Sequence, residues 1–156
     1  MPVSSFRSCA YAFLYAGRLD RVQAYLDLDE GSYFSYWGTV LLDLRLANDA
    51  AALDAARRVP PALPTRRFME PCLEGRRGAA LDGPAARFIE FWKQHKDPEL
   101  GYALAPMLAY CGRPADALAF LRWAAELKFC AYPALDLDPI WDAMRESAEF
   151  RPNPSD

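Results

Sequence analysis

Apolar side chains recur along this chain with the period of amphipathic helices. In the first helix they take the i, i+3, i+4 and i+7 positions of one face, at Phe6, Cys9, Ala10 and Phe13. Gly17 ends this helix, and a second helix is expected from about residue 19 to residue 28. Alternating patterns typical of strands are scarce, so the sequence predicts an all-α fold of about eight or nine helices.

Capping residues and helix breakers divide the rest of the chain in the same way. Ser32 or Ser35 is expected to begin a third helix, and Asn48 marks the turn into an alanine-rich fourth helix. Three prolines near residue 60 break that helix. Asp82 is a possible cap after an enlarged turn, and Asp97 is expected to begin a later helix.

Two stretches almost a hundred positions apart have similar sequences, Tyr15-Ala16-Gly17-Arg18 and Tyr110-Cys111-Gly112-Arg113. The predicted turns at Gly17, Asn48, about Gly78 and Gly112 lie 31, about 30 and about 34 residues apart. A helix pair cannot bury its apolar face alone, so such units must stack on one another. Small residues are expected where stacked helices approach closely, at Ala10, Ala105 and Ala117.

The first and last units resemble the tetratricopeptide repeat (TPR), a pair of helices of about 34 residues. The matching positions in the first unit are Phe6, Cys9, Ala10, Phe13, Gly17, Val22 and Leu26, and those in the last are Leu104, Ala105, Gly112, Ala117, Leu121 and Ala124. The resemblance implies a right-handed superhelix of stacked antiparallel helix pairs. It also implies one domain over residues 4–150, with units at about 4–30, 32–60, 65–96 and 98–129.

The segment from Leu137 to Phe150 is similar to the one that closes the repeat array at the C-terminal end of certain bacterial signalling proteins. These are notably winged-helix transcriptional regulators and adenylate-cyclase-like proteins. Asp138 and Pro139 are expected to begin a capping helix over 138–149, in which Trp141 covers the last exposed apolar face. Residues 151–156 are expected to form a disordered tail. The resemblance implies the regulatory half of a larger bacterial signalling or transcription protein, or a free-standing relic of one.

The composition is that of a globular protein, with 53% hydrophobic and 25% charged residues. The net charge is -3, whereas nucleic-acid-binding proteins usually have an excess of basic residues. No apolar run reaches the ~20 residues that a membrane span needs. The charge is uneven, because residues 57–87 hold seven arginines against three acidic residues. This basic stretch is either a solvated face or a site for an acidic partner.

The cysteines and the single histidine do not have the spacing of a metal site. No CxxC pair occurs among Cys9, Cys72, Cys111 and Cys130, so we expect small buried hydrophobic residues in a reducing compartment. His95 lies near a predicted helix C-terminus, where packing or capping is favoured over a ligand role. We therefore expect no metal, no cofactor and a cytoplasmic location.

The sequence favours a scaffold over an enzyme. It contains no Gly-rich phosphate loop, no HExxH and no GxSxG motif. The expected function is non-enzymatic protein-protein interaction, without direct nucleic-acid or membrane binding. The alternative is a small-molecule-sensing module with a ligand in the concave groove. A closed apolar pocket would favour sensing, and an open groove would favour a peptide partner. The identity of the partner and the oligomeric state stay open.

Candidate partner-binding residues lie one step away from the apolar stripes of the first helix in each unit, which line the concave side in repeats of this type. They are Arg7, Tyr11, Arg45, Tyr102 and Tyr110. Tyrosine and arginine often anchor recognition, although the same residues could flank the core and solubilise the surface. If they bind, the expected occupant is an acidic or aromatic segment of a protein partner.

Overall fold

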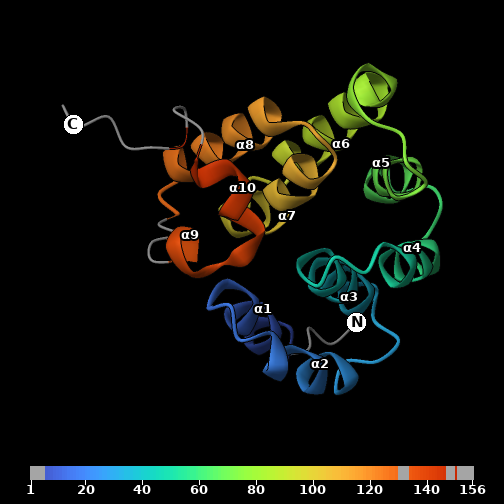
Figure 1. Cartoon of the computed structure of the whole chain (residues 1–156), viewed down its shortest axis with the longest axis vertical. Coiled ribbons are helices and arrows are strands. Elements are labelled where there is room, and N and C mark those ends of the chain that lie inside the picture. Colours follow the sequence, from blue (N-terminus) through green and yellow to red (C-terminus); the bar gives the residue numbers. More distant parts are fainter. Residues whose placement is uncertain (1–5, 130–133, 147–149, 151–156) are drawn as a thin grey trace.

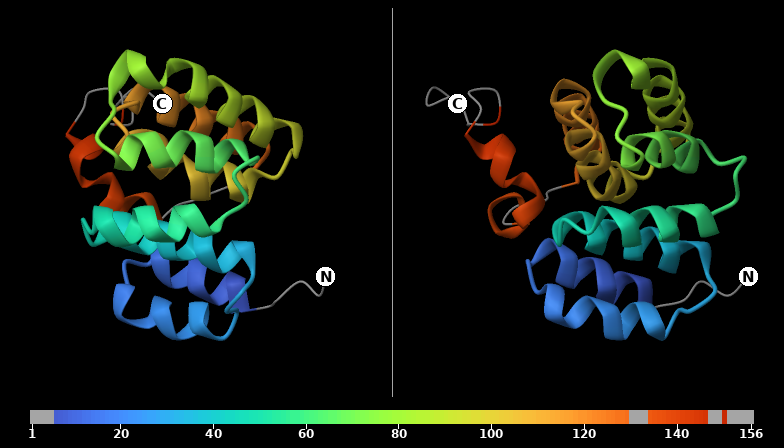
Figure 2. Two further views of the ribbon diagram at one scale, coloured as in Figure 1. Left: turned by 90° about the vertical axis from the view of Figure 1, so that its right-hand side faces the viewer. Right: turned by 45° about the vertical axis from the view of Figure 1, so that its right-hand side comes forward.

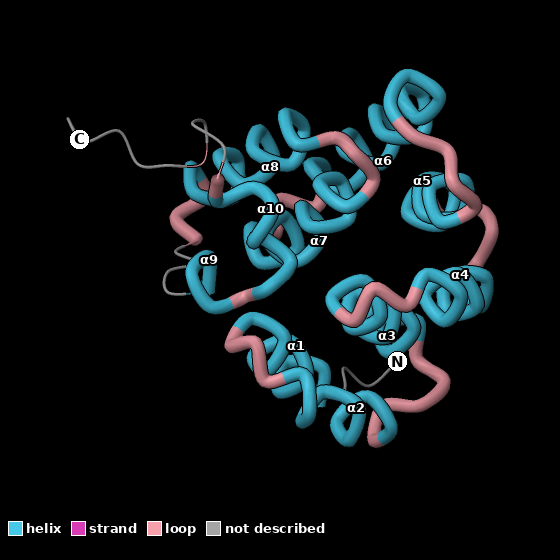
Figure 3. The backbone as a smooth tube through the Cα atoms, in the orientation of Figure 1, coloured by secondary structure: helices cyan, strands magenta, loops and turns pink. Residues whose placement is uncertain are grey.

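The computed structural model describes residues 6–129, 134–146 and 150, with side chains from residue 9 onward. Ten α-helices and two short 3-10 helices, η1 and η2, occupy these ranges, and no strand occurs within them. Short loops join the helices (Figure 3). The prediction of an all-α fold is therefore confirmed for the described part of the chain.

Most helices follow one another in contacting pairs (Figure 1). Their bounds are α1 (Phe6–Tyr15), α2 (Leu19–Asp27), α3 (Tyr33–Arg45), α4 (Asp49–Arg58), α5 (Pro64–Leu73), η1 (Gly78–Leu81), α6 (Asp82–Gln94), α7 (Pro98–Tyr110), α8 (Pro114–Glu126), α9 (Ala134–Leu137), η2 (Pro139–Trp141) and α10 (Asp142–Arg145). α1 packs on α2, α3 on α4, α5 on α6, and α7 on α8. α3 also contacts α7 directly, so the inner helices of separate pairs meet.

Local capping chemistry sets several helix starts. The side chains of Ser32, Asn48 and Asp97 accept backbone hydrogen bonds at the first turns of α3, α4 and α7, which confirms these predictions. Asp82 differs from its prediction, because it is the first residue of α6 and makes no capping hydrogen bond. The 3-10 turn η1 leads directly into α6 and leaves Leu81, not Asp82, at the capping position.

Buried apolar side chains from α1 to α8 form the core, which also takes in Trp141 and Met144 near the C-terminus. The predicted burial of Ala10, Ala105 and Ala117 is confirmed, since each is at most 1% exposed. Larger rings fill the space within and between the pairs. Phe88 of α6, for example, lies 5.1 Å from Phe68 of α5 and 6.2 Å from Phe120 of α8, measured between ring centroids.

A disulfide joins Cys72 near the end of α5 to Cys111, the residue after α7. Both cysteines are buried as expected, but the expectation of free thiols is wrong for this pair. Packing of the helix pairs brings their Cα atoms to 5.7 Å, within the range that a disulfide spans. Cys9 is exposed rather than buried, and Cys130 lies outside the described residues. A reducing compartment therefore no longer follows from the cysteines.

The C-terminal helices lie on the inner side of the arc that α1 to α8 form (Figures 1 and 2). α9 contacts α1, and η2 contacts both α3 and α7. The predicted capping helix over 138–149 is thus wrong in form and in place. Its described part is the 3-10 turn η2 followed by the short α10, while residues 147–149 lie outside the described residues, as does the predicted tail 151–156. The reason is that Trp141 and Asp138 find their partners on α7 and α3 rather than on an outer face.

Candidate functional site

The candidate residues do not form an open surface. Tyr11 and Tyr102 are 5% and 1% exposed, and the side chain of Arg45 is fully buried, so the expectation that these three face solvent is wrong. Tyr110 is partly buried, and the side chain of Arg7 lies outside the described residues. Arg45 and Tyr102 do project to the inner side of the arc, but the chain's own residues 134–145 contact them there. We call these residues the resident segment, and the sides of α1, α3 and α7 that it contacts the groove.

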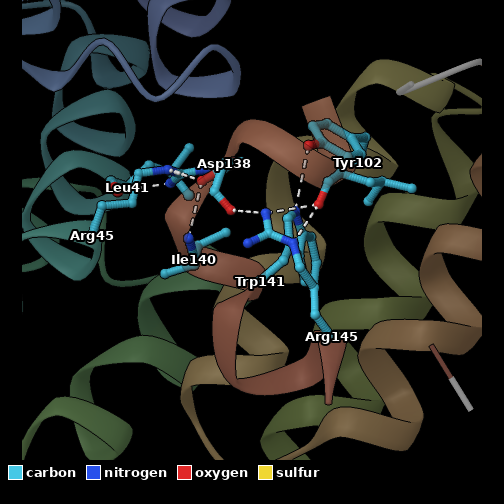
Figure 4. A network of polar contacts seen from close by, with 8 residues as sticks. Leu41, Arg45, Tyr102, Asp138, Ile140, Trp141 and Arg145 are labelled. Atoms are coloured by element: carbon cyan, nitrogen blue, oxygen red, sulfur yellow. Dashed lines mark hydrogen bonds and ion pairs between the residues drawn. The ribbon is translucent and has the colours of Figure 1, made fainter. Parts of the chain in front are cut away.

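A buried ion pair between Arg45 and Asp138 anchors the resident segment to α3 (Figure 4). The guanidinium donates from Nε to Asp138 Oδ1 at 2.8 Å and from Nη2 to Oδ2 at 2.5 Å. The third nitrogen, Nη1, donates to the carbonyl of Leu41 at 2.8 Å. Both charged side chains are 0% exposed, so the pair is bidentate and fully removed from water.

Asp138 has a second role, which the sequence predicted. Its Oδ1 accepts a hydrogen bond from the backbone nitrogen of Ile140 at 3.1 Å, and Pro139 occupies the first position of η2. The carboxylate therefore begins the local turn and binds Arg45 at the same time. The capping signal was readable from the sequence, but the ion pair was not, because its partners are 93 residues apart.

Trp141 places the apolar part of the resident segment against α7. It is 0% exposed, and its Nε1 donates to the hydroxyl of Tyr102 at 3.4 Å. Tyr102 also meets the ring of Tyr15 edge-on, with centroids 4.8 Å apart. Burial raises the pKa of Tyr102 to about 12, so the neutral phenol is the form that the site holds.

Arg145 holds the resident segment in its turned conformation. Its Nε and Nη2 donate to the carbonyl of Leu135 at 3.0 and 2.8 Å, and Nη2 also donates to the carbonyl of Asp138 at 2.7 Å. These bonds lie within the segment and do not involve the groove. The segment therefore presents Asp138 and Trp141 as a preorganised unit.

Gly17 lets the resident segment approach α1 closely. A Cβ atom at this position would lie 2.8 Å from the carbonyl oxygen of Leu137, and the backbone φ of +67° also favours glycine. Gly112 holds the equivalent turn of the repeat with φ +74°, but a Cβ there would meet only Arg77 Cδ, at 3.7 Å. The two glycines thus differ in whether a neighbouring chain segment needs the space.

One buried polar atom beside this cluster has no partner. The hydroxyl of Tyr15 makes no hydrogen bond to any part of the chain that the structure describes. Burial is the largest cause that raises its pKa above the ordinary value, followed by the nearby Tyr11 hydroxyl. Tyr15 was not among the predicted site residues. The available signal was the similarity of the stretch Tyr15-Ala16-Gly17-Arg18 to residues 110–113.

Tyr110 lies apart from Asp138 and Trp141. Its hydroxyl donates to Asp49 at the start of α4, and the pKa of Tyr110 is raised to about 12, mainly by burial and then by this hydrogen bond.

His95 caps the end of α6, where its Nδ1 lies 2.9 Å from the carbonyl of Phe91. This confirms the predicted capping role of the histidine.

Comparison of the chain with models of known protein families, with curated proteins and with solved structures finds no match. Among the described residues, no three His, Cys, Asp or Glu side chains come together in a group that could hold a metal ion. The helices in those same ranges are all too short or too polar to cross a membrane.

Proposed function

We propose that this chain is a non-enzymatic helical-repeat module that mediates protein-protein interaction by holding a peptide segment in its groove. The resident segment is then the intramolecular occupant of a site that a partner segment of similar chemistry can take. One observation carries the proposal. The Arg45–Asp138 ion pair connects residues 93 positions apart and is completely buried.

A buried ion pair of this kind favours recognition over simple stabilisation. Removing two charges from water costs several kcal/mol per ion, and apolar replacements are often at least as stable. What the pair provides is selectivity, because only a segment with a carboxylate at the right place can neutralise Arg45. Trp141 adds an aromatic anchor three residues later. The proposed recognition pattern is therefore an acidic residue, a proline and a following aromatic residue.

The unpartnered hydroxyl of Tyr15 favours an occupant that can be exchanged. An unsatisfied buried hydroxyl costs about 1–3 kcal/mol, and the resident segment leaves this one unpaired. A partner segment that offers a hydrogen-bond acceptor to Tyr15 would gain that free energy. The resident segment would then compete with partners, so a partner segment must bind the groove tightly enough to displace it.

The paired helices and the repeated glycine turns support a TPR-like, right-handed superhelix, which we include in the proposal. A role as the regulatory half of a bacterial signalling or transcription protein fits a groove whose access is controlled. It stays a prediction, as do the cytoplasmic location and the small-molecule alternative. A disulfide between buried cysteines is more typical of oxidising compartments, and this weighs against the cytoplasm.

A peptide added in trans tests whether the groove recognises a segment. The full chain carrying Asp138→Asn keeps its groove but loses the anchor of its resident segment. A fluorescein-labelled peptide with the sequence of residues 134–145 should bind this variant at least about tenfold more tightly than it binds the unaltered chain, because the internal competitor is weakened by more than about 1.4 kcal/mol. Fluorescence anisotropy measures both affinities.

Matched changes separate recognition from general charge effects. Asp136→Asn removes an exposed carboxylate from the same segment and should leave peptide binding as weak as in the unaltered chain. The peptide that itself carries Asp138→Asn should bind poorly to every variant. The proposal fails if the Asp138→Asn chain, shown to be folded by circular dichroism, ignores the peptide or binds both peptides equally.

A further inference from the structure

A surface pocket lies on α5 and α6, two helices that do not form the groove. Pro64, Arg67, Pro84 and Arg87 line this pocket, which has a volume of about 260 Å³. Pro64 is the first residue of α5, and Pro84 lies in the first turn of α6. The pocket therefore combines two guanidinium groups with two apolar walls at the positive ends of two helices.

The two arginines of the pocket differ from Arg57, Arg58 and Arg66 of the basic stretch, which each have a carboxylate partner. Arg57 and Arg66 share Glu70 as a counterion. Arg67 and Arg87, in contrast, have no carboxylate within ion-pair distance anywhere in ranges 6–129 and 134–146 and at residue 150. Two unneutralised positive charges thus face one small cavity.

Backbone carbonyls hold each of these guanidinium groups by one edge. Arg67 Nε donates to the carbonyl of Pro61 at 3.1 Å, and Arg87 Nε donates to that of Gly83 at 3.4 Å. Both bonds use Nε, so the terminal Nη atoms stay available as a planar donor pair. Such a pair binds an oxyanion with two parallel hydrogen bonds.

The helix ends that surround the pocket add no competing negative charge. The first turn of α5 contains no acidic residue. The first turn of α6 contains Asp82, but Arg113 neutralises it in an ion pair. The local potential is therefore positive, although the whole chain has a net charge of -3.

We propose that this pocket binds an acidic segment of a protein partner, with one carboxylate between Arg67 and Arg87 and a neighbouring apolar side chain against the two prolines. The mixed lining favours this occupant over a bare inorganic anion, because a phosphate ion would leave both prolines without a contact. The site is separate from the groove, so it can be right or wrong independently of the peptide site proposed above.

The test titrates the unaltered, ¹⁵N-labelled full chain with the peptide acetyl-Leu-Glu-Glu-Leu-amide and follows the arginine Nε–Hε signals by NMR. We expect saturable shifts at Arg67 and Arg87. Arg67→Gln and Arg87→Gln should each weaken binding about tenfold, since each removes one charge-assisted donor pair. The matched controls are Arg76→Gln and Arg122→Gln, which remove exposed arginines that also lack an ion-pair partner in the described ranges.

Three results would overturn the proposal. The control variants could weaken binding as much as the pocket variants, which would show general charge attraction. The pocket variants could bind the peptide like the unaltered chain, which would place the peptide elsewhere. Inorganic phosphate, titrated in a parallel experiment, could bind the pocket more tightly than the peptide does, which would identify an anion site rather than a site for an acidic segment.

Discussion

Replacing Asp138 by asparagine should release the resident segment while leaving the rest of the chain folded. The change keeps the shape of the side chain but leaves the Arg45 guanidinium buried without a counterion. Breaking a fully buried pair in this way costs about 3–5 kcal/mol. Complete burial of a large apolar side chain such as Trp141 contributes about 1.5–3 kcal/mol in the opposite direction. The charge penalty exceeds the contribution of Trp141 alone, so the segment should leave the groove far more often than in the unaltered chain, and each opening hydrates Arg45.

Native-state hydrogen exchange distinguishes release of the segment from global unfolding. The backbone amides of Asp138, Ile140 and Trp141 donate to acceptors within the resident segment, and their protection should fall by at least about a hundredfold in Asp138→Asn. The amides at the centre of α7 should keep nearly the protection that they have in the unaltered chain. Urea unfolding of the same samples measures global stability.

A second substitution in the same chain checks the assignment of the penalty to the buried charge. Arg45→Met removes the guanidinium, so the double variant with Asp138→Asn should regain part of the lost protection. Our reasoning is refuted if Asp138→Asn lowers the protection of α7 as much as that of the segment, because the pair would then stabilise the fold as a whole. Unchanged protection of the segment would equally refute it.

Three further changes test other parts of the structure. Gly17→Ala should destabilise the chain by about 1 kcal/mol more than Gly112→Ala in urea unfolding, because both strain a left-handed turn but only the first clashes with the resident segment; equal effects would contradict the segment's place. Cys72→Ala should lower the free energy of unfolding by about 2–4 kcal/mol under oxidising conditions. Under reducing conditions, the free energies of unfolding of this variant and of the unaltered chain should differ much less. The raised pKa of Tyr102 contributes to the free energy of unfolding. This contribution should be complete below about pH 10 and should decline by about 2–3 kcal/mol as the pH rises toward 12. Tyr102→Phe should flatten this decline in unfolding measurements between pH 8 and pH 11.5, and an unchanged slope would show that the phenol is not held neutral.

Local signals predicted the elements well because their physical causes lie within a few residues. Ser32, Asn48 and Asp97 cap their helices through atoms two or three positions away, so the sequence contained all the necessary information. The burial of Ala105 followed in the same way from its place in an apolar stripe. Element existence and much of the core were therefore predictable.

The site was only half predictable because its other half comes from distant residues. The helical period correctly predicted that Arg45 and Tyr102 lie on the inner side of the array. It carried no information on the residues that cover them. Asp138 is 93 positions from Arg45, and Trp141 is 39 positions from Tyr102. The disulfide was missed for the same reason, since packing between helix pairs, and not spacing in the sequence, brings Cys72 to Cys111.

The disulfide also determines how the molecule transmits mechanical tension. When the chain is pulled at its two ends, the load passes directly through the bond between Cys72 and Cys111, which are 39 positions apart. The loop between them holds α6 and α7 and carries no load, which shortens the extensible chain by about 130 Å. α1, α3 and the resident segment lie outside this loop. Tension would therefore pull the resident segment away from α7, which the disulfide protects from the load. The groove of the oxidised chain can then open under force while α7, the helix that contains Tyr102, stays folded.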